Sequence, residues 1–565
     1  MSGLSRGVQR LAFQKNVDRL LAEASDKRGL AKTLSAFNLV TLGVAGIIGG
    51  GIFVLVGTGI VTAGAMVVPA FVVAALICAV AGLAYAELAS AIPASGSAYA
   101  YIYAAIGELP GWMVAWALIL EYAVGAVSVA VACRNNILAV INQFWHLSGG
   151  DRGVNIFADP EHKLLYGLTH SPLESGQVVN AAGDNITLTG IVNLPSILIV
   201  LLVTALLVRG TKESARVTAV LVTIKVAILL FAIGVAFSLF DGANFSHLLP
   251  CYNTLTGVPC YAPGFDAAAP TYDVTGFGDA VKAVMAAAAI MFFAYIGFDS
   301  VSTTAEETKN PKRDLPIGIL GSLGISTLLY ILAAGALVGA SHWSEFVGPS
   351  ATAQAAVGEP FGYVFETHHR LDVTVNGAPF SLGALLVRLG AFIGTTSVLL
   401  VLILGGVRVF FNMSRDGLLP AWMSAIGRRG NPATTTWIYG AFTLVLAGLL
   451  TLGAAVELVN IGTLFAFFMV ILATWIFRRK RPDVERPFRM PALAVLAVLG
   501  MVGTLGLIVS LDAFTLMASV TWAGIGLLIY ALYGVRHSRE AAERMEALTP
   551  RPKVRPVTSA LGKED

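Results

Sequence analysis

The sequence is dominated by about twelve apolar segments, each long enough to cross a lipid bilayer as a helix. A hydrocarbon layer of about 30 Å needs about 20 mostly apolar residues in helical conformation. Hydrophobic residues make up 56% of the chain and charged residues 13%, which is more apolar surface than a water-soluble core absorbs. The sequence therefore predicts an all-α integral membrane protein. The segments are expected at residues 35–60, 65–91, 111–143, 191–209, 216–240, 277–306, 315–341, 382–412, 434–453, 456–477, 491–511 and 514–535.

The positive charges predict how these segments are oriented. Most of the 37 lysines and arginines fall in connections that share one side of the membrane if both termini lie on that side. Because cationic loops stay in the cytoplasm, we expect both ends inside the cell and the protein in the cytoplasmic membrane. Residues 1–34 would form a cytoplasmic arm and residues 536–565 a cytoplasmic tail. These cations flank apolar segments and face lipid, so they do not indicate a nucleic-acid partner.

Three outer connections are long, at residues 144–190, 241–276 and 342–381. The middle one contains CYNTLTGVPC, so Cys251 and Cys260 are expected to close a small disulfide loop in an oxidising compartment. Two free thiols are the alternative. The eight histidines do not cluster, and no zinc pattern, nucleophile elbow or phosphate loop is present. The sequence thus indicates no metal, no cofactor and no enzyme.

The first apolar segment carries three consecutive glycines in GIIGGGIF, residues 46–53. Glycine disfavours a helix interior by about 1 kcal/mol relative to alanine, so Gly49, Gly50 and Gly51 favour local unwinding. Close helix packing through small residues is an almost equal alternative, because Gly43, Gly46 and Gly50 also follow small-residue spacing. The stretch alone does not separate the two interpretations.

A second interrupted segment favours unwinding. FFAYIGFDSVSTTAEETKNP, residues 292–311, places Gly297 and then Asp299 partway along the sixth segment. Breaks in the first and sixth segments are typical of an inverted repeat of five plus five spans, with a binding site between them near the midplane. We expect one repeat at residues 35–240, a second at 277–477, and two further spans at 478–535.

Helix ends at such breaks determine what the site binds. Free amides where the first segment restarts, at Gly50, Gly51 and Ile52, would face an anion, and free carbonyls near Ala45 and Ile47 would face a cation. The sixth segment repeats this arrangement between Phe293 and Gly297. An α-amino acid carries a carboxylate and an ammonium a few ångströms apart and suits both sets. Glycines without a Cβ let such a ligand approach the backbone.

Several motifs resemble one transporter superfamily. They are GIIGGGIF, AYAELASAIPASGSAYAY, LILEY, KESARV, FFAYIGFDSVSTTAEETKNPKRDLPIGI and NMSRDGLLP. They are similar to the amino acid, polyamine and organocation superfamily, specifically its cationic amino acid transporter branch and the bacterial relatives of that branch. The resemblance runs from about Leu34 to Tyr533. It implies a LeuT-type fold of five plus five helices, with two added C-terminal helices and alternating access.

The resemblance also implies roles for individual residues. The carbonyls of Ile47, Phe293 and Ile296 would hold the substrate ammonium, and the amides of Gly50 and Gly51 its carboxylate. Phe293 would close over the substrate as an aromatic gate. The expected substrate-binding residues are Ile47, Gly49, Gly50, Gly51, Phe293, Ala294 and Ile296.

Lys225 lies about halfway along the fifth segment, where placing a charged side chain in the membrane raises the free energy. Burial disfavours the ammonium form and favours proton exchange. In similar proton-coupled transporters, a lysine here takes the place of sodium, between the carbonyls of Ala45 and Ile48 and the hydroxyl of Thr395 or Thr396. A lysine that extends to the membrane surface is the alternative.

Two acids also lie within segments. Asp299 would gate the site or respond to protons, or would simply cap the second half-helix. Glu121 in the third segment would relay a proton or attract a cationic side chain, and packing against a polar neighbour is equally consistent with its position.

These features predict a secondary active transporter of L-amino acids, either cationic or small and neutral. We expect proton symport, with the substrate, protons and the bilayer as partners. A sensor that binds an amino acid without transport and a sodium symporter are the alternatives. A channel is less consistent with the sequence, because neither a repeated pore loop nor a charged ring is visible.

Overall fold

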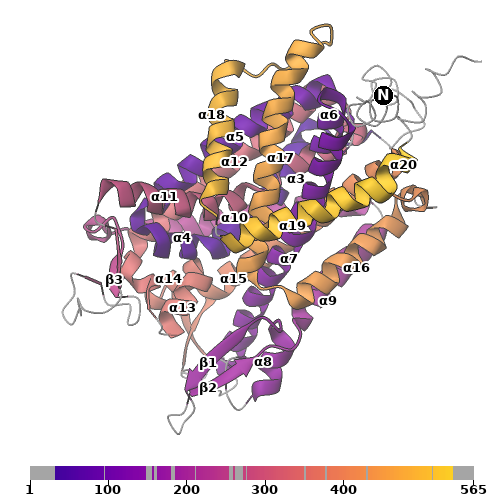
Figure 1. Ribbon diagram of the computed structural model, residues 1–565. Coiled ribbons are helices and arrows are strands. Elements are labelled where there is room, and N and C mark those ends of the chain that lie inside the picture. The colour runs from indigo at the N-terminus through magenta and orange to yellow at the C-terminus, as the bar shows by residue number, and fades with distance from the viewer. Residues whose placement is uncertain are drawn as a thin grey trace, which may run out of the picture.

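The computed structural model describes residues 32–538 except 95, 148–155, 158, 160–161, 180–184, 210, 254–258, 261–270, 275, 349–350, 376–377, 428–430 and 512. The expected cytoplasmic arm and tail therefore lie almost entirely outside the described residues. Within the described part, the structure is built mainly of helices, with three small two-stranded sheets (Figure 1).

Long apolar helices form the body of the molecule. In the described residues, eight stretches are long and apolar enough to cross a membrane: Ala36–Ala91, Glu108–His146, Val217–Ser238, Phe277–Glu307, Pro311–Ala340, Leu382–Arg415, Leu452–Lys480 and Ala513–His537. Three shorter apolar helices accompany them: α9 (Leu194–Arg209), α16 (Ala433–Leu449) and α18 (Leu493–Val509). Every expected apolar segment falls on one of these stretches or helices, and Ala36–Ala91 contains two of them. The chain is an integral membrane protein of helical architecture.

Two long helices each pack against several other helices of the bundle. α7 (Glu108–Leu147) packs against α15 (Leu382–Arg415) and α17 (Leu452–Lys480). α12 (Pro311–Ala340) packs against α5 (Val67–Ala91) and against the first helix of the bundle, α3 (Ala36–Ile47). α10 (Thr211–Ser238) contacts α15, α12 and α3. Elements far apart in the sequence thus surround α3, which is buried along its second half.

Large apolar side chains cover the outside of the bundle, as lipid contact requires. α18 exposes Val498, Leu499 and Val502, and α19 (Ala513–Ile529) exposes Phe514 and Val520. α19 is fixed to α7 by paired tryptophans: each of Trp116 and Trp522 donates its indole N–H to the backbone carbonyl of the other, at 2.8 and 3.0 Å. The outer position of α19 is visible in Figure 1.

The long connections contain more structure than the sequence indicated. The described residues form three hairpins: β1 (Ser175–Val179) with β2 (Asn185–Thr189), β3 (Cys251–Asn253) with β4 (Thr271–Asp273), and β5 (Asp372–Val375) with β6 (Ala378–Ser381). The short helices α8 (Lys163–Thr169), α13 (Ala351–Gly358) and α14 (Pro360–Thr367) lie in the same connections. Two other short helices lie elsewhere: α6 (Ala98–Ala105) between α5 and α7, and α20 (Val535–His537) after α19.

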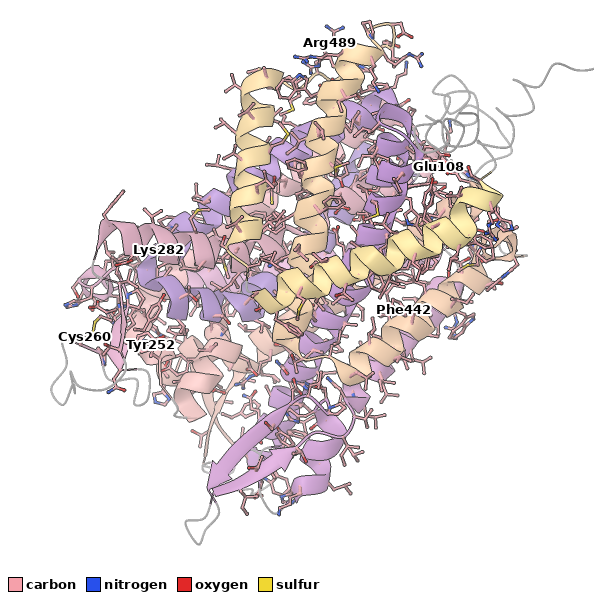
Figure 2. All side chains as sticks on the ribbon, viewed as in Figure 1. Glu108, Tyr252, Cys260, Lys282, Phe442 and Arg489 are labelled. Carbon is pink, nitrogen blue, oxygen red and sulfur yellow. A yellow bond between two sulfur atoms is a disulfide. The ribbon has the colours of Figure 1, made fainter. Side chains whose placement is uncertain are left out.

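The connections between the helices lie at different ends of the molecule. The three hairpins belong to the connections expected outside. In Figure 2, Cys260 and Lys282 lie at the left, whereas Glu108 and Arg489 lie toward the upper end. Cys251 and Cys260 form a disulfide, with their Cα atoms 5.4 Å apart.

Arg134 fastens α7 to the α8 region. Its guanidinium donates to Glu174 Oε2 at 2.7 Å and to the carbonyl of Thr169 at 3.1 Å. His170 stacks on Tyr166 with ring centroids 3.9 Å apart. Burial, with the nearby charge of Arg134, lowers the pKa of His170 to about 4.

We expect this region to lose stability in mild acid. A histidine held neutral in the folded state contributes stability that is complete above its unfolded pKa of about 6.5 and declines as pH falls toward 4. The protection factors of the amides across residues 163–175, which correct for the intrinsic pH dependence of exchange, should therefore fall between pH 6.5 and 4. His170→Phe keeps the stacked ring and should flatten this pH dependence; an unchanged pH profile in that variant would contradict the assignment to His170.

Candidate functional site

The first membrane helix is interrupted after Ile47. α3 ends there, Ile48 is extended (φ −76°, ψ 106°), and the chain resumes at Gly51 as a single π-helical turn that leads into α4 (Val56–Ala63). The first backbone hydrogen bond after the break runs from Phe53 N to Gly49 O at 3.2 Å. The amides of Gly50, Gly51 and Ile52 precede this bond, as the first amides of any helix do.

The second interruption follows α11 (Phe277–Phe292). A 3₁₀ turn at Phe293–Tyr295 leads to an extended Ile296 and to Gly297 in the left-handed region (φ 117°). A 3₁₀ helix then runs over Phe298–Glu307. Both interruptions lie where the sequence predicted them, because glycine is found at each position that needs a tight approach or a positive φ.

The two interruptions lie against each other. A Cβ added to Gly297 would lie 2.6 Å from Gly46 O, and one added to Gly51 would lie 2.3 Å from the Cβ of Ala294. A Cβ added to Gly49 would lie 2.5 Å from the Val398 side chain. The glycines therefore allow both the breaks and the close packing around them, so the two sequence-based interpretations coexist.

A small buried cavity lies at the crossing of the two breaks. It is lined by Gly46, Ile47, Gly50, Gly51, Gly125, Val129, Phe293, Ile296, Val398 and Leu402. The volume open to the centre of a water molecule is about 10 Å³, roughly the space for one water. Five of the seven expected substrate-binding residues are among the lining residues, whereas Gly49 and Ala294 are not. The sequence did not indicate the contributions of α7 and α15.

Tyr330 of α12 joins both breaks through one hydroxyl. The hydroxyl lies 2.7 Å from Ile47 O and 2.9 Å from Ala294 O, and the ring is completely buried. The single O–H of Tyr330 is shared between the last carbonyl of α3 and a carbonyl of the second break, so it holds the two breaks together. Sequence reasoning missed this residue, because a tyrosine in an apolar segment looks like any packing aromatic.

We expect Tyr330→Phe to weaken ligand binding about tenfold while the protein still folds. The change removes the hydroxyl and leaves the ring, so about 1 to 2 kcal/mol of hydrogen bonding to the break carbonyls is lost. Substrate affinity measured by isothermal calorimetry on the purified protein checks this. Tyr363→Phe, which removes a hydroxyl that contacts Glu345 away from the two breaks, is the matched control. Equal affinities for both variants would contradict a role for Tyr330 at the breaks.

Lys225 is completely buried and lies at the first break. Its ammonium donates to Ala45 O at 2.9 Å, to Ile48 O at 2.6 Å and to Ser397 Oγ at 2.7 Å. The side chain thus does not extend to the membrane surface. A charged lysine has three N–H donors, and three oxygens accept them here.

The hydroxyl beside Lys225 differs from the expected one. Thr395 donates to the carbonyls of Ala391 and Phe392 of its own helix, and Thr396 donates to that of Phe392. The Ser397 hydroxyl contacts Lys225 and also lies 3.3 Å from Ala45 O. Residues on a helix point in directions about 100° apart, so a shift of two positions reaches a different face.

Two acids are buried beside the second break. Asp299 accepts a hydrogen bond from the Tyr122 hydroxyl, and its Oδ1 has no hydrogen-bond partner in the described residues. Glu121 precedes Tyr122 on α7; both of its carboxyl oxygens are buried without a hydrogen bond in the same part of the chain. The two carboxyl groups lie close enough to interact electrostatically. An unpaired buried carboxylate is strongly unfavourable, so this arrangement suits groups that hold protons.

Ion pairs join several of the helices. Glu307, at the end of the 3₁₀ helix that follows Gly297, pairs with Arg408 of α15, and Glu306 pairs with Arg415. Glu87 at the end of α5 pairs with Arg478 of α17. No group of three or more histidines, cysteines or acids that could hold a metal ion occurs within the described ranges.

Comparison with known proteins extends the resemblance noted in the motifs. A family model described as amino acid permease matches residues 33–535. The branched-chain amino acid permease BcaP of Bacillus subtilis (strain 168) is 35% identical over 527 residues, which cover 93% of this chain and 98% of that protein. The methylthioribose transporter of the same strain is 34% identical over 528 residues, with the same coverage. Vacuolar cationic amino acid transporter 4 of Arabidopsis thaliana is 32% identical over 479 residues, or 84% of this chain and 68% of that protein.

Proposed function

The chain belongs to the amino acid permease family of the amino acid, polyamine and organocation superfamily, and from this premise we propose proton-coupled transport of neutral, apolar L-amino acids. Amino acid transport follows from the family. The substrate class, the coupling ion and the transport cycle are the proposal.

The side chains around the cavity support a neutral substrate. Beyond the two breaks, the cavity is lined by Gly125, Val129, Val398 and Leu402, and none of its lining residues is ionisable. Glu121 is one helical turn from Gly125 but is not among the lining residues. In a conformation that widens this cavity enough for a substrate, a cationic side chain against the same lining would lose its hydration without gaining a carboxylate, whereas an aliphatic one gains apolar contacts. This lining is the observation that carries the substrate proposal.

The polar parts of the site suit the rest of an amino acid. The amides of Gly50 and Gly51 would bind the substrate carboxylate, and the carbonyls of Ile47, Phe293 and Ile296 would bind its ammonium. Ile47 O already accepts from the Tyr330 hydroxyl, and its second lone pair remains for the ammonium. Twelve spans in a five plus five inverted repeat, with both termini in the cytoplasm, would provide alternating access around these breaks.

Coupling to protons is supported by Lys225, Glu121 and Asp299. Protonated Lys225 donates one N–H to each of three oxygens: the carbonyls of Ala45 and Ile48 at the first break and the hydroxyl of Ser397 on α15. A neutral amine has only two N–H donors for the same three oxygens. Its protonation state would therefore change how firmly the break is held. The carboxyl groups of Glu121 and Asp299 offer a second place for a proton beside the other break.

Uptake into proteoliposomes tests the proposal. Labelled leucine, valine, alanine, arginine and methylthioribose would be offered with an inward proton gradient, a sodium gradient or no gradient. We expect accumulation of the neutral amino acids only with the proton gradient. Sodium-driven uptake would refute proton coupling, and preferred uptake of arginine or methylthioribose would refute the neutral amino acid substrate. Binding of leucine without any uptake would favour a sensor.

We expect Glu121→Gln to change the pH response more than the affinity. The amide keeps the shape but cannot exchange a proton, so uptake should lose its dependence on the proton gradient while the leucine affinity changes less than threefold. Glu485→Gln, at an exposed acid that pairs with Lys312, serves as the control. If Glu121→Gln and the control follow the same pH profile, Glu121 has no part in coupling.

A further inference from the structure

A second cavity lies far from the two breaks, between the adjoining ends of α17 and α18. Its volume is about 410 Å³, and it is lined by Trp475, Arg478, Arg479, Ala492, Leu493, Ala494 and Val495. The 481–492 connection joins the two helices at this end, and Figure 2 shows Arg489 there. Because both helices are apolar up to this point, the cavity lies at the level where the membrane surface begins.

One wall of the cavity is apolar and continues along α18. Leu493, Ala494 and Val495 form this wall, and Val495 is 62% exposed. The side chains of Val498, Leu499 and Val502 extend the exposed apolar surface further along the same helix. Trp475 on the opposite wall has an apolar ring and an N–H group, a combination typical of residues at the membrane–water boundary.

The other end of the cavity is positively charged. The guanidinium of Arg479 lies 5.2 Å from the centroid of the Trp475 ring, and in the described part of the chain no carboxylate pairs with Arg479 or Arg489. Arg478 and Arg486 share a single acid, Glu87. Burial lowers the pKa of Arg486; Glu87 opposes this effect, while Arg478 and Arg489 add to it. Positive charge therefore exceeds negative charge around the cavity.

We propose that this cavity binds an anionic phospholipid, with its phosphate at Arg478 and Arg479 and its acyl chains along α18. A ligand with a phosphate next to long apolar chains matches the charged end and the apolar wall together. Planar guanidinium groups bind phosphate oxygens through paired N–H donors. Basic pockets between helices at the cytoplasmic surface are suited to such headgroups. This inference needs only a membrane-embedded chain and does not depend on the proposed substrate.

The site would also connect lipid to the bundle. Arg478 donates its Nε–H to Glu87 Oε1 at 3.0 Å and a further N–H to Met490 O at 3.0 Å. Met490 N in turn donates to Glu87 Oε2 at 2.8 Å. A phosphate at Arg478 would therefore lie next to the link between α5, α17 and the 481–492 connection.

Native mass spectrometry of the full chain in detergent, titrated with phosphatidylglycerol and with phosphatidylcholine, tests the proposal. We expect phosphatidylglycerol to bind at least about tenfold more tightly. Arg479→Gln should remove that preference, and Ala494→Glu should do the same from the opposite wall by adding a negative charge. Both positions are exposed, so folding should be preserved. Arg481→Gln, in the same connection but outside the cavity lining, should keep the preference.

Two results would overturn the inference. If both variants retain the preference for phosphatidylglycerol, the lipid binds elsewhere. A separate titration with inorganic phosphate distinguishes a lipid from a free anion: Arg479-dependent protection by phosphate against heat, with no preference between the two lipids, would identify a site for a soluble anion.

Discussion

Lys225→Met should abolish accumulation driven by a proton gradient and weaken substrate binding by about a hundredfold. The methionine fills the same volume but leaves the carbonyls of Ala45 and Ile48 and the hydroxyl of Ser397 without their donor. Losing the charge-assisted hydrogen bonds to the two carbonyls alone, each at the lower end of the usual range, costs about 3 kcal/mol, which corresponds to roughly a hundredfold in affinity. Uptake and binding measured on the same preparation separate the two effects.

The control for this change is Lys282→Met. Lys282 is exposed in the first turns of α11, where it pairs with Asp279, so its loss should leave transport unchanged. The thermal midpoint of each variant shows whether the protein remains folded. A folded Lys225→Met protein that still accumulates substrate in response to the proton gradient would exclude this lysine from coupling.

Gly297→Ala should reduce transport at least tenfold and lower the thermal midpoint. The residue has φ 117°, a conformation that costs alanine about 1 to 3 kcal/mol. The added Cβ would also lie 2.6 Å from Gly46 O, which is backbone and has little room to move. The two breaks would therefore have to separate, and this would distort the cavity between them.

Gly324→Ala provides the matched comparison, because it lies within α12 with no atom within 4 Å of an added Cβ. It should keep wild-type transport and stability. Wild-type transport by Gly297→Ala would mean that the close approach of the two breaks is unnecessary for function.

Local signals in the sequence were sufficient to locate the helices and the two breaks. Apolar length predicts a membrane helix, and each expected segment falls on an apolar helix or stretch in the structure. Three adjacent glycines and the Gly297 position indicate broken helices, because backbone preference is local. The five plus five arrangement and the roles of the site residues stay predictions.

Contacts between distant segments could not be predicted in the same way. Tyr330 and Ile47 are 283 residues apart, and only the packing of α12 against α3 brings them together. Ser397 rather than Thr395 faces Lys225, because the rotation of α15 about its axis decides which hydroxyl is near. The hairpins and Arg134 were missed for a related reason: their pairing partners lie in connections whose sequences carry no strong periodicity.

The hydroxyl of Tyr330 has a consequence for how this chain can diverge. Its two acceptors are backbone carbonyls, which every residue type supplies, so positions 47 and 294 can change side chain without losing their acceptors. The donor has no such redundancy and comes from one side chain. Amino-acid substitutions in descendants of this sequence should therefore differ between these positions. Position 330 should remain tyrosine, whereas the residues at positions 47 and 294 should vary within the limits of packing.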